Sequence, residues 1–171
     1  NTKSELDRRF ARLDAEFRRD RTLAEAYLAF SVFLNTVKCG HTYANFFNQS
    51  ERVAGALLKG QRLPFYFRWI DRRMIVTRNF SSDPRLAAGT EILAVDGVPV
   101  PTILARLMTI ARADGHNDAK RLSYLEVTGD SRFEAFDIYL PLFFPPRGDT
   151  RAFTIRRFGA RRTERVPLAM L

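Results

Sequence analysis

The polar stretch Cys39-Gly40-His41-Thr42 holds the side chains of this 171-residue chain that are best suited to chemistry. An imidazole has an ordinary pKa of about 6.5, so a histidine such as His41 has the chemistry to accept and release a proton near neutral pH. Cys39 lies two positions before His41. Side chains two positions apart diverge in most backbone conformations, which favours a small buried cysteine over a thiol–imidazole pair. A histidine that only caps or packs at a helix junction fits the same stretch, so both roles of His41 stay open.

Two other groups of residues have suitable chemistry but poor spacing. Asp114, His116 and Asp118 alternate in a polar loop, yet without cysteine partners or a second histidine they indicate a solvated loop more than a cation site. We therefore predict no metal and no cofactor. Five serines that could serve as nucleophiles have no base at motif spacing: Ser31, Ser81, Ser82, Ser123 and Ser131. We expect this chain by itself to be catalytically inactive.

The composition suits one or two compact domains, with 46% hydrophobic residues and a formal net charge of +9. The charge is spread over several arginine pairs: Arg8-Arg9, Arg18-Arg19, Arg72-Arg73, Arg156-Arg157 and Arg161-Arg162. Because aromatic residues are not interleaved with these pairs, solvated faces are favoured over a nucleic-acid surface. Cys39 is the only cysteine, which excludes a disulfide within the chain. No apolar run reaches the ~18 residues that a membrane span needs.

The first sixty residues are typical of helices. An apolar stripe with helical spacing predicts a first helix, capped by Ser4 with Asp7; its members are Leu6, Phe10, Leu13 and Phe17. Thr22-Leu23-Ala24-Glu25 is a capping box for a second helix, with Gly40 placed to end it. A third helical piece is expected within residues 45–58, with Gly60 as its stop.

After Leu63-Pro64 the pattern alternates as in strands. We predict a hairpin from Phe65–Ile70 and Met74–Arg78, and a second hairpin from residues 152–158 and 163–168. Helices are predicted over residues 101–113 and for a turn or two within 121–127, whereas residues 136–144 are apolar and β-rich. The predicted fold class is therefore α+β, with helices before the boundary near residue 60 and mostly strands after it.

The stretch from Ala87 to Val100, A-A-G-T-E-I-L-A-V-D-G-V-P-V, is the most informative part of the strand-rich region. Glu91–Val95 is a short apolar run with turn residues at both ends, and Asp96-Gly97 is a strong tight-turn dipeptide. With the helix that follows, this stretch resembles the PDZ domains of exported serine proteases. The resemblance implies that a peptide binds near Ala88, Gly89, Thr90, Glu91 and Ile92, with the loop Ser81–Gly89 holding its terminal carboxylate. An ordinary strand–turn–helix of another α+β domain is the alternative.

The order of the motifs widens the resemblance. A helical segment, Gly40-His41-Thr42 and then the PDZ-like stretch follow one another as in the C-terminal-processing and tricorn-type serine peptidases. This resemblance implies a helical N-terminal subdomain over residues 1–60 and a PDZ-like domain over residues 61–171. It also implies an α/β catalytic domain further along, whose serine would use His41 as its base in tricorn-type members. The processing branch uses a lysine of that later domain instead, and Gly40 stands where tricorn-type members have a serine, which leaves the orienting partner of His41 open.

We therefore expect the N-terminal, substrate-recognising part of an exported serine peptidase, periplasmic or secreted. Its expected partners are a peptide or protein substrate and the downstream catalytic domain, without nucleic acid and without a membrane span; the oligomeric state stays open. The hydrophobic run Val166–Leu171 at the end of the sequence is consistent with such a fragment. A non-enzymatic PDZ-like scaffold that binds peptides or proteins is the alternative function.

Overall fold

A computed structural model gives the fold, and it describes the chain except for residues 1, 46–47, 58–60 and 132–133. The fold is α+β, as predicted. The chain forms two compact units: Asn1–Lys59 with Thr109–Arg121, and Gly60–Met108 with Leu122–Leu171. The first unit thus takes in a segment that lies far beyond the expected boundary at residue 60. The predicted helix stop at Gly60 lies outside the described residues.

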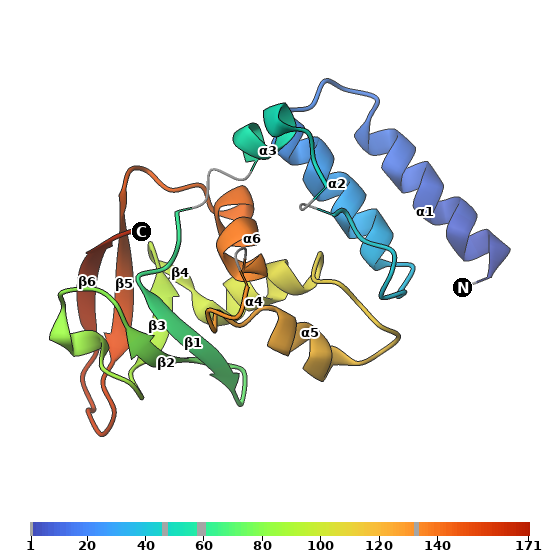
Figure 1. Ribbon diagram of the computed structural model, residues 1–171. Coiled ribbons are helices and arrows are strands. Elements are labelled where there is room, and N and C mark those ends of the chain that lie inside the picture. Colours follow the sequence, from blue (N-terminus) through green and yellow to red (C-terminus); the bar gives the residue numbers. More distant parts are fainter. Residues whose placement is uncertain (1, 46–47, 58–60, 132–133) are drawn as a thin grey trace. The chain divides into compact units, whose positions relative to one another are not determined.

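The first unit contains α1 (Lys3–Glu16), α2 (Leu23–Asn35) and α3 (Glu51–Leu57). Figure 1 shows α1 and α2 side by side as an antiparallel pair. The capping box of α2 is confirmed, because Glu25 N–H donates to Thr22 Oγ1 (3.2 Å) and Thr22 N–H donates to the Glu25 carboxylate (2.8 Å). The predicted Ser4 cap of α1 is wrong. Thr2 and Glu5 form that capping box instead, two residues before the predicted cap.

The second helix ends at Asn35, five residues before the predicted stop at Gly40. The amides of Thr36 and Val37 already bond three residues back, to Phe33 O (3.0 Å) and Leu34 O (3.1 Å). Lys38 then adopts a left-handed backbone with φ of +56°. Two β-branched residues at 36–37 have low helix propensity and favour this early end. Gly40 therefore belongs to the turn that carries His41 rather than to a helix end.

The second unit is built on one antiparallel sheet, with α4 and α6 beside it (Figure 1). Its strands are β1 (Phe65–Ile70), β2 (Arg73–Asn79), β3 (Glu91–Val95), β4 (Val98–Pro99), β5 (Thr150–Arg156) and β6 (Glu164–Ala169). The strand order is β1-β2-β3-β5-β6, with β4 paired to β3. Both predicted hairpins are confirmed. The turn after β3 also forms as predicted, with positive φ at Asp96 (51°) and Gly97 (82°).

Three helices of the strand-rich region differ from prediction. The helix expected over 101–113 is α4 (Val100–Met108), and the helical turns expected within 121–127 belong to α5 (Asp118–Tyr124), after which the chain becomes extended. Residues 136–144 form the helix α6 (Ala135–Phe143), not a β-rich segment. Ala135 to Leu140 are all buried. A helix buried on every side shows no apolar period, so a short apolar run does not distinguish helix from strand.

The core of this unit joins the sheet to α4 and α6. The rings of Phe65 and Phe153 meet edge to face at 5.4 Å between centroids, and those of Phe67 and Phe136 meet at 4.8 Å. All four side chains are fully buried. The helix α4 also packs against β2, β3 and α6, and its buried side chains extend this core. None of the helices within the described residues is long and apolar enough to cross a membrane.

Candidate functional site

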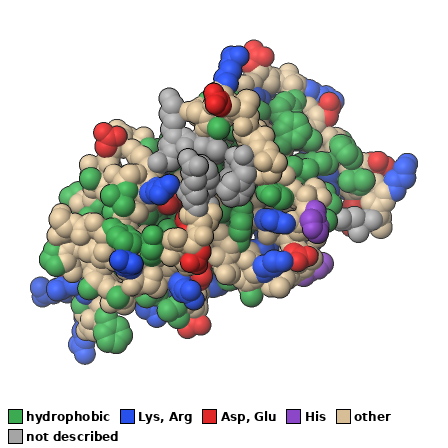
Figure 2. Space-filling view, viewed as in Figure 1, with side chains coloured by type: hydrophobic (Ala, Val, Ile, Leu, Met, Phe, Trp, Pro, Cys, Tyr) green, Lys and Arg blue, Asp and Glu red, His purple; other side chains and the backbone are tan. Residues whose placement is uncertain are grey.

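His41 lies in a tight turn after α2, and its side chain is exposed. The turn is closed by Thr42 N–H, which donates to Cys39 O (3.0 Å). Cys39 is half-buried. Hydrogen bonds from His41 N–H and from the Thr42 hydroxyl lower the pKa of this thiol. The backbone amide of His41 thus serves Cys39, while its side chain is exposed; Figure 2 shows histidine side chains at the surface beside charged residues.

Residues 109–115, which lie far from His41 along the sequence, hold the His41 turn in place. Gly115 N–H donates to Lys38 O (2.9 Å), and Arg112 Nε donates to Gly40 O. The Arg112 guanidinium also lies over the ring of Tyr43, 4.6 Å from its centroid. These contacts are made to residues before His41, at Lys38 and Gly40, and after it, at Tyr43. The backbone that carries the imidazole is therefore held on both sides.

Asp114 brings a carboxylate close to this turn. A Cβ built on Gly40 would lie 3.5 Å from Asp114 Cγ. The pKa of Asp114 is lowered mainly by the ammonium of Lys120, whose Nζ is 2.7 Å from the carboxylate, and to a smaller degree by the charge of His41. Asp114 thus lies beside the His41 turn with its carboxylate paired to Lys120, and the orienting partner of His41 stays open. The contacts of Arg112 and the nearness of Asp114 were missed, because no spacing rule connects residues 38–43 with residues 109–115.

Asp114, His116 and Asp118 do not act together as a cation site. Asp114 pairs with Lys120, and Asp118 pairs with Arg121 (2.7 Å). Across the described part of the chain, no cluster of three or more histidine, cysteine or acidic side chains could hold a metal ion. His116 is exposed in the same loop.

The candidate peptide-binding residues Ala88, Gly89, Thr90, Glu91 and Ile92 lie around the start of β3. Ala88 is exposed and Gly89 half-buried, but the other three are buried. The backbones of Glu91 and Ile92 pair with β2 on one side and β5 on the other, so no further strand can be added beside these two residues. Binding at these positions stays a prediction, and only Ala88 and Gly89 offer surface for it.

The carboxylate of Glu91 already has two partners. Arg73 binds it in a bidentate manner at 3.0 and 2.8 Å, and Arg156 approaches to 2.6 Å. Hydrogen bonds from Arg73 are the main cause that lowers the pKa of Glu91. This ion-pair cluster ties β2, β3 and β5 together, which is a structural role.

The loop Ser81–Gly89 was expected to hold a peptide carboxylate with its amides. The amides of Ser81, Asp83 and Arg85 instead donate to side chains of the same loop region, at 2.8, 3.2 and 3.0 Å. Gly89 N–H donates to Val76 O (2.9 Å). These amides are therefore not free to hold an anion.

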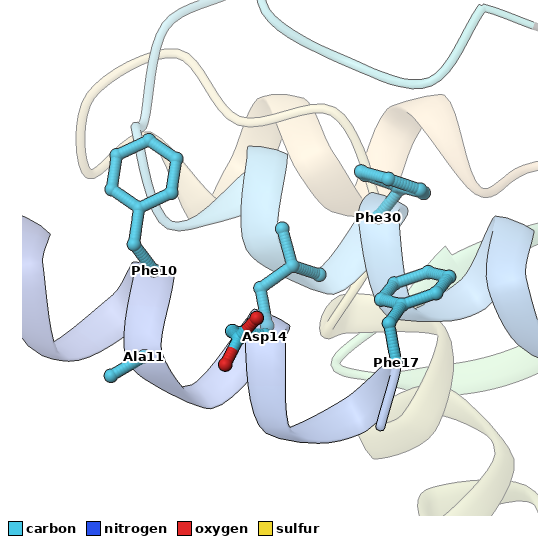
Figure 3. A pocket seen from close by; sticks show the side chains of 6 residues that line it. Phe10, Ala11, Asp14, Phe17 and Phe30 are labelled. Atoms are coloured by element: carbon cyan, nitrogen blue, oxygen red, sulfur yellow. The ribbon is translucent and has the colours of Figure 1, made fainter. Parts of the chain in front are cut away.

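A hollow lies between α1 and α2 in the first unit. Figure 3 shows Phe17 and Phe30 facing each other across it, with ring centroids 5.0 Å apart. Asp14 also lines the hollow, and its carboxylate binds Arg18 at 3.1 Å. Because its lining is otherwise apolar, this hollow offers helix–helix packing rather than a catalytic group.

No protein-family model and no curated protein matches this chain. Among solved structures, chains of CPAF, a chlamydial serine protease, are similar in fold. The TM-scores are 0.59 for a serine-to-alanine mutant of CPAF (20% identity), 0.57 for mature CPAF complexed with lactacystin (17%) and 0.52 for mature CPAF (18%). Each comparison covers 96% of this chain but only 28% or 29% of the CPAF chain. The likeness at this identity is one of fold, to part of a serine protease.

Proposed function

We propose that this chain is the N-terminal, substrate-recognising part of an exported serine peptidase whose nucleophilic serine lies in a further domain. The observation that carries the proposal is the fold, which is similar to part of a serine protease over 96% of the chain. Export to the periplasm or the exterior is part of the proposal and follows from the resemblance of the sequence motifs.

In this proposal His41 is the general base. When the serine attacks a peptide carbonyl, the imidazole takes the hydroxyl proton and then returns a proton to the leaving amine. Such a base must be accessible and must keep its position. The exposed ring of His41 and the contacts of Arg112 and Gly115 to the flanking backbone support both requirements.

The sheet unit would bind the substrate. In PDZ-like recognition an extended peptide adds a strand to a sheet edge, and main-chain hydrogen bonds provide the affinity. The outer strands of the antiparallel sheet in this unit are β1 and β6. Substrate binding and proton transfer would then be divided between the two units of the chain.

The test uses the full-length protein that contains this chain, with His41→Ala and the control His116→Ala, which replaces the other exposed histidine of the same unit. His41→Ala should lower kcat for a fluorogenic peptide by about 10²–10⁴, with little change in KM, because a general base acts in the transition state. His116→Ala should keep normal turnover, and the present chain alone should be inactive. A folded His41→Ala protein with near-normal kcat would exclude His41 as the base and favour the lysine-dependent branch.

A non-enzymatic scaffold is the second candidate, because strand addition to the sheet needs no catalytic group. The full-length coding sequence separates the two functions. A serine flanked by glycines in a later α/β domain supports the peptidase, whereas its absence supports the scaffold.

A further inference from the structure

The strand β1 forms one edge of the sheet (Figure 1). An outer strand presents unpaired N–H and C=O groups, which are a template for another strand. On the side of β1 that faces away from β2, however, the chain has placed its own residues 125–129. This segment follows α5 and belongs to the same unit as the sheet.

The segment pairs with β1 as an antiparallel strand would. Phe67 N–H donates to Val127 O (2.9 Å), and Val127 N–H donates to Phe67 O (3.4 Å). One step along β1, Trp69 N–H donates to Glu126 Oε1 (3.1 Å) and the indole N–H donates to Leu125 O (3.1 Å). Two successive outward positions of β1 are therefore occupied.

Burial strengthens this pairing. Leu125 is fully buried and Val127 is 2% exposed. The segment therefore makes main-chain hydrogen bonds to β1 and also buries apolar side chains beside it. In strand addition, main-chain bonds provide affinity and side-chain pockets provide specificity.

Gly129 lies at the end of the segment and packs against Tyr66 of β1. Gly129 has φ of +83°, and a Cβ there would overlap the hydroxyl and ring of Tyr66. The Glu134 carboxylate accepts hydrogen bonds from Gly129 N–H (2.8 Å) and Thr128 N–H (3.3 Å). A residue with a Cβ at position 129 would be strained by the positive φ and would have to displace the Tyr66 ring, so glycine allows the segment to lie against β1.

We propose that the outer edge of β1 is a strand-binding site and that residues 125–128 are its ligand in cis, closing the site to other peptides. The ligand class that the edge accepts is an extended peptide antiparallel to β1, with an acidic residue followed by a β-branched apolar one, as in Glu126-Val127. The inference deepens the peptide binding of the proposed function and rests on it. A tethered ligand acts at an effective concentration of about millimolar, so free peptide at micromolar concentration cannot compete until the segment is released.

The experiment measures binding of a fluorescein-labelled peptide with the sequence of residues 124–130, YLEVTGD, to the chain itself by fluorescence anisotropy. Gly129→Ala releases the segment, and Gly148→Ala is the matched control, because a Cβ on Gly148 meets nothing within 4 Å. The affinity of Gly129→Ala for the peptide should exceed that of the parent and of Gly148→Ala at least about ten-fold, since more of the protein has an open edge. Hydrogen exchange at the amides of Phe67 and Trp69 should be faster in Gly129→Ala as well.

A second variant, Glu126→Ala, removes the bond to Trp69 N–H and serves if Gly129→Ala does not fold. The proposal is overturned if every folded release variant binds the peptide no more tightly than Gly148→Ala. It is also overturned if the parent binds as tightly as they do, or if a scrambled peptide binds equally well. Since this assay needs no catalysis, its failure is distinct from a failure of His41 as the general base.

Discussion

Asp137 is a carboxyl group buried in the first turn of α6, with 6% of its surface exposed. Burial raises its pKa from 3.8 to about 7, with help from the nearby charge of Glu134, although the Leu63 N–H bond (3.2 Å) opposes the rise. The folded state therefore holds the proton more tightly than the unfolded chain. The stability that this proton provides is complete below pH 4 and is lost as the pH rises through 7.

Replacing Asp137 by asparagine keeps a neutral group that can accept the Leu63 N–H bond at every pH. A pKa that is higher by roughly three corresponds to about 4 kcal/mol, since each tenfold change in proton affinity is ~1.4 kcal/mol. Asp137→Asn should therefore raise the free energy of unfolding by about 4 kcal/mol at pH 8.5 but only about 1 kcal/mol at pH 4.5. The gain in the free energy of unfolding is largest above pH 7, because the folded parent protein carries a buried charge at Asp137 in that range.

Urea unfolding at the two pH values, followed by Trp69 fluorescence, measures this difference. Trp69 is the only tryptophan and lies 6.3 Å from Phe136 between ring centroids, so it reports on the unit that contains Asp137. Asp71→Asn is the control, because Asp71 is exposed in a turn of the same unit. The reasoning is refuted if Asp137→Asn and the parent lose stability in parallel between pH 4.5 and 8.5.

Two further changes test local features of the backbone. Gly97→Val should destabilise the second unit by about 1–3 kcal/mol, because φ at Gly97 is +82° and a β-branched residue is strained there; an unchanged urea midpoint would contradict the turn geometry. Thr22→Ala should cost about 1 kcal/mol by removing the acceptor for Glu25 N–H. Circular dichroism during thermal unfolding measures this loss, and Thr22→Ser, which keeps the hydroxyl, should lose much less.

Local signals in the sequence predicted the elements that depend on local chemistry. Thr22 and Glu25 cap α2 because both cap bonds lie within four residues. Asp96-Gly97 makes the predicted turn because the dipeptide itself tolerates positive φ. The exposed position of His41 also agrees with its place in a polar stretch after a helix.

Contacts between distant parts of the chain had no such signal. The hydrogen bond from Arg112 to Gly40 joins two loops, and loops have no periodicity from which a partner could be inferred. Val127 was expected in a helix, but pairing with Phe67 draws it into an extended backbone. Tertiary contacts override local preference at such positions.

The way the chain threads its two units limits how they can be exchanged. The backbone passes from the first unit to the second at residue 60, returns at Thr109 and leaves again after Arg121. A gene fusion or duplication cut at residue 60 would separate the His41 turn from Arg112 and Gly115, which hold it. The two units are therefore expected to be inherited together. If the chain after residue 60 were fused to another protein, residues 109–121 would be present without the His41 turn that they contact.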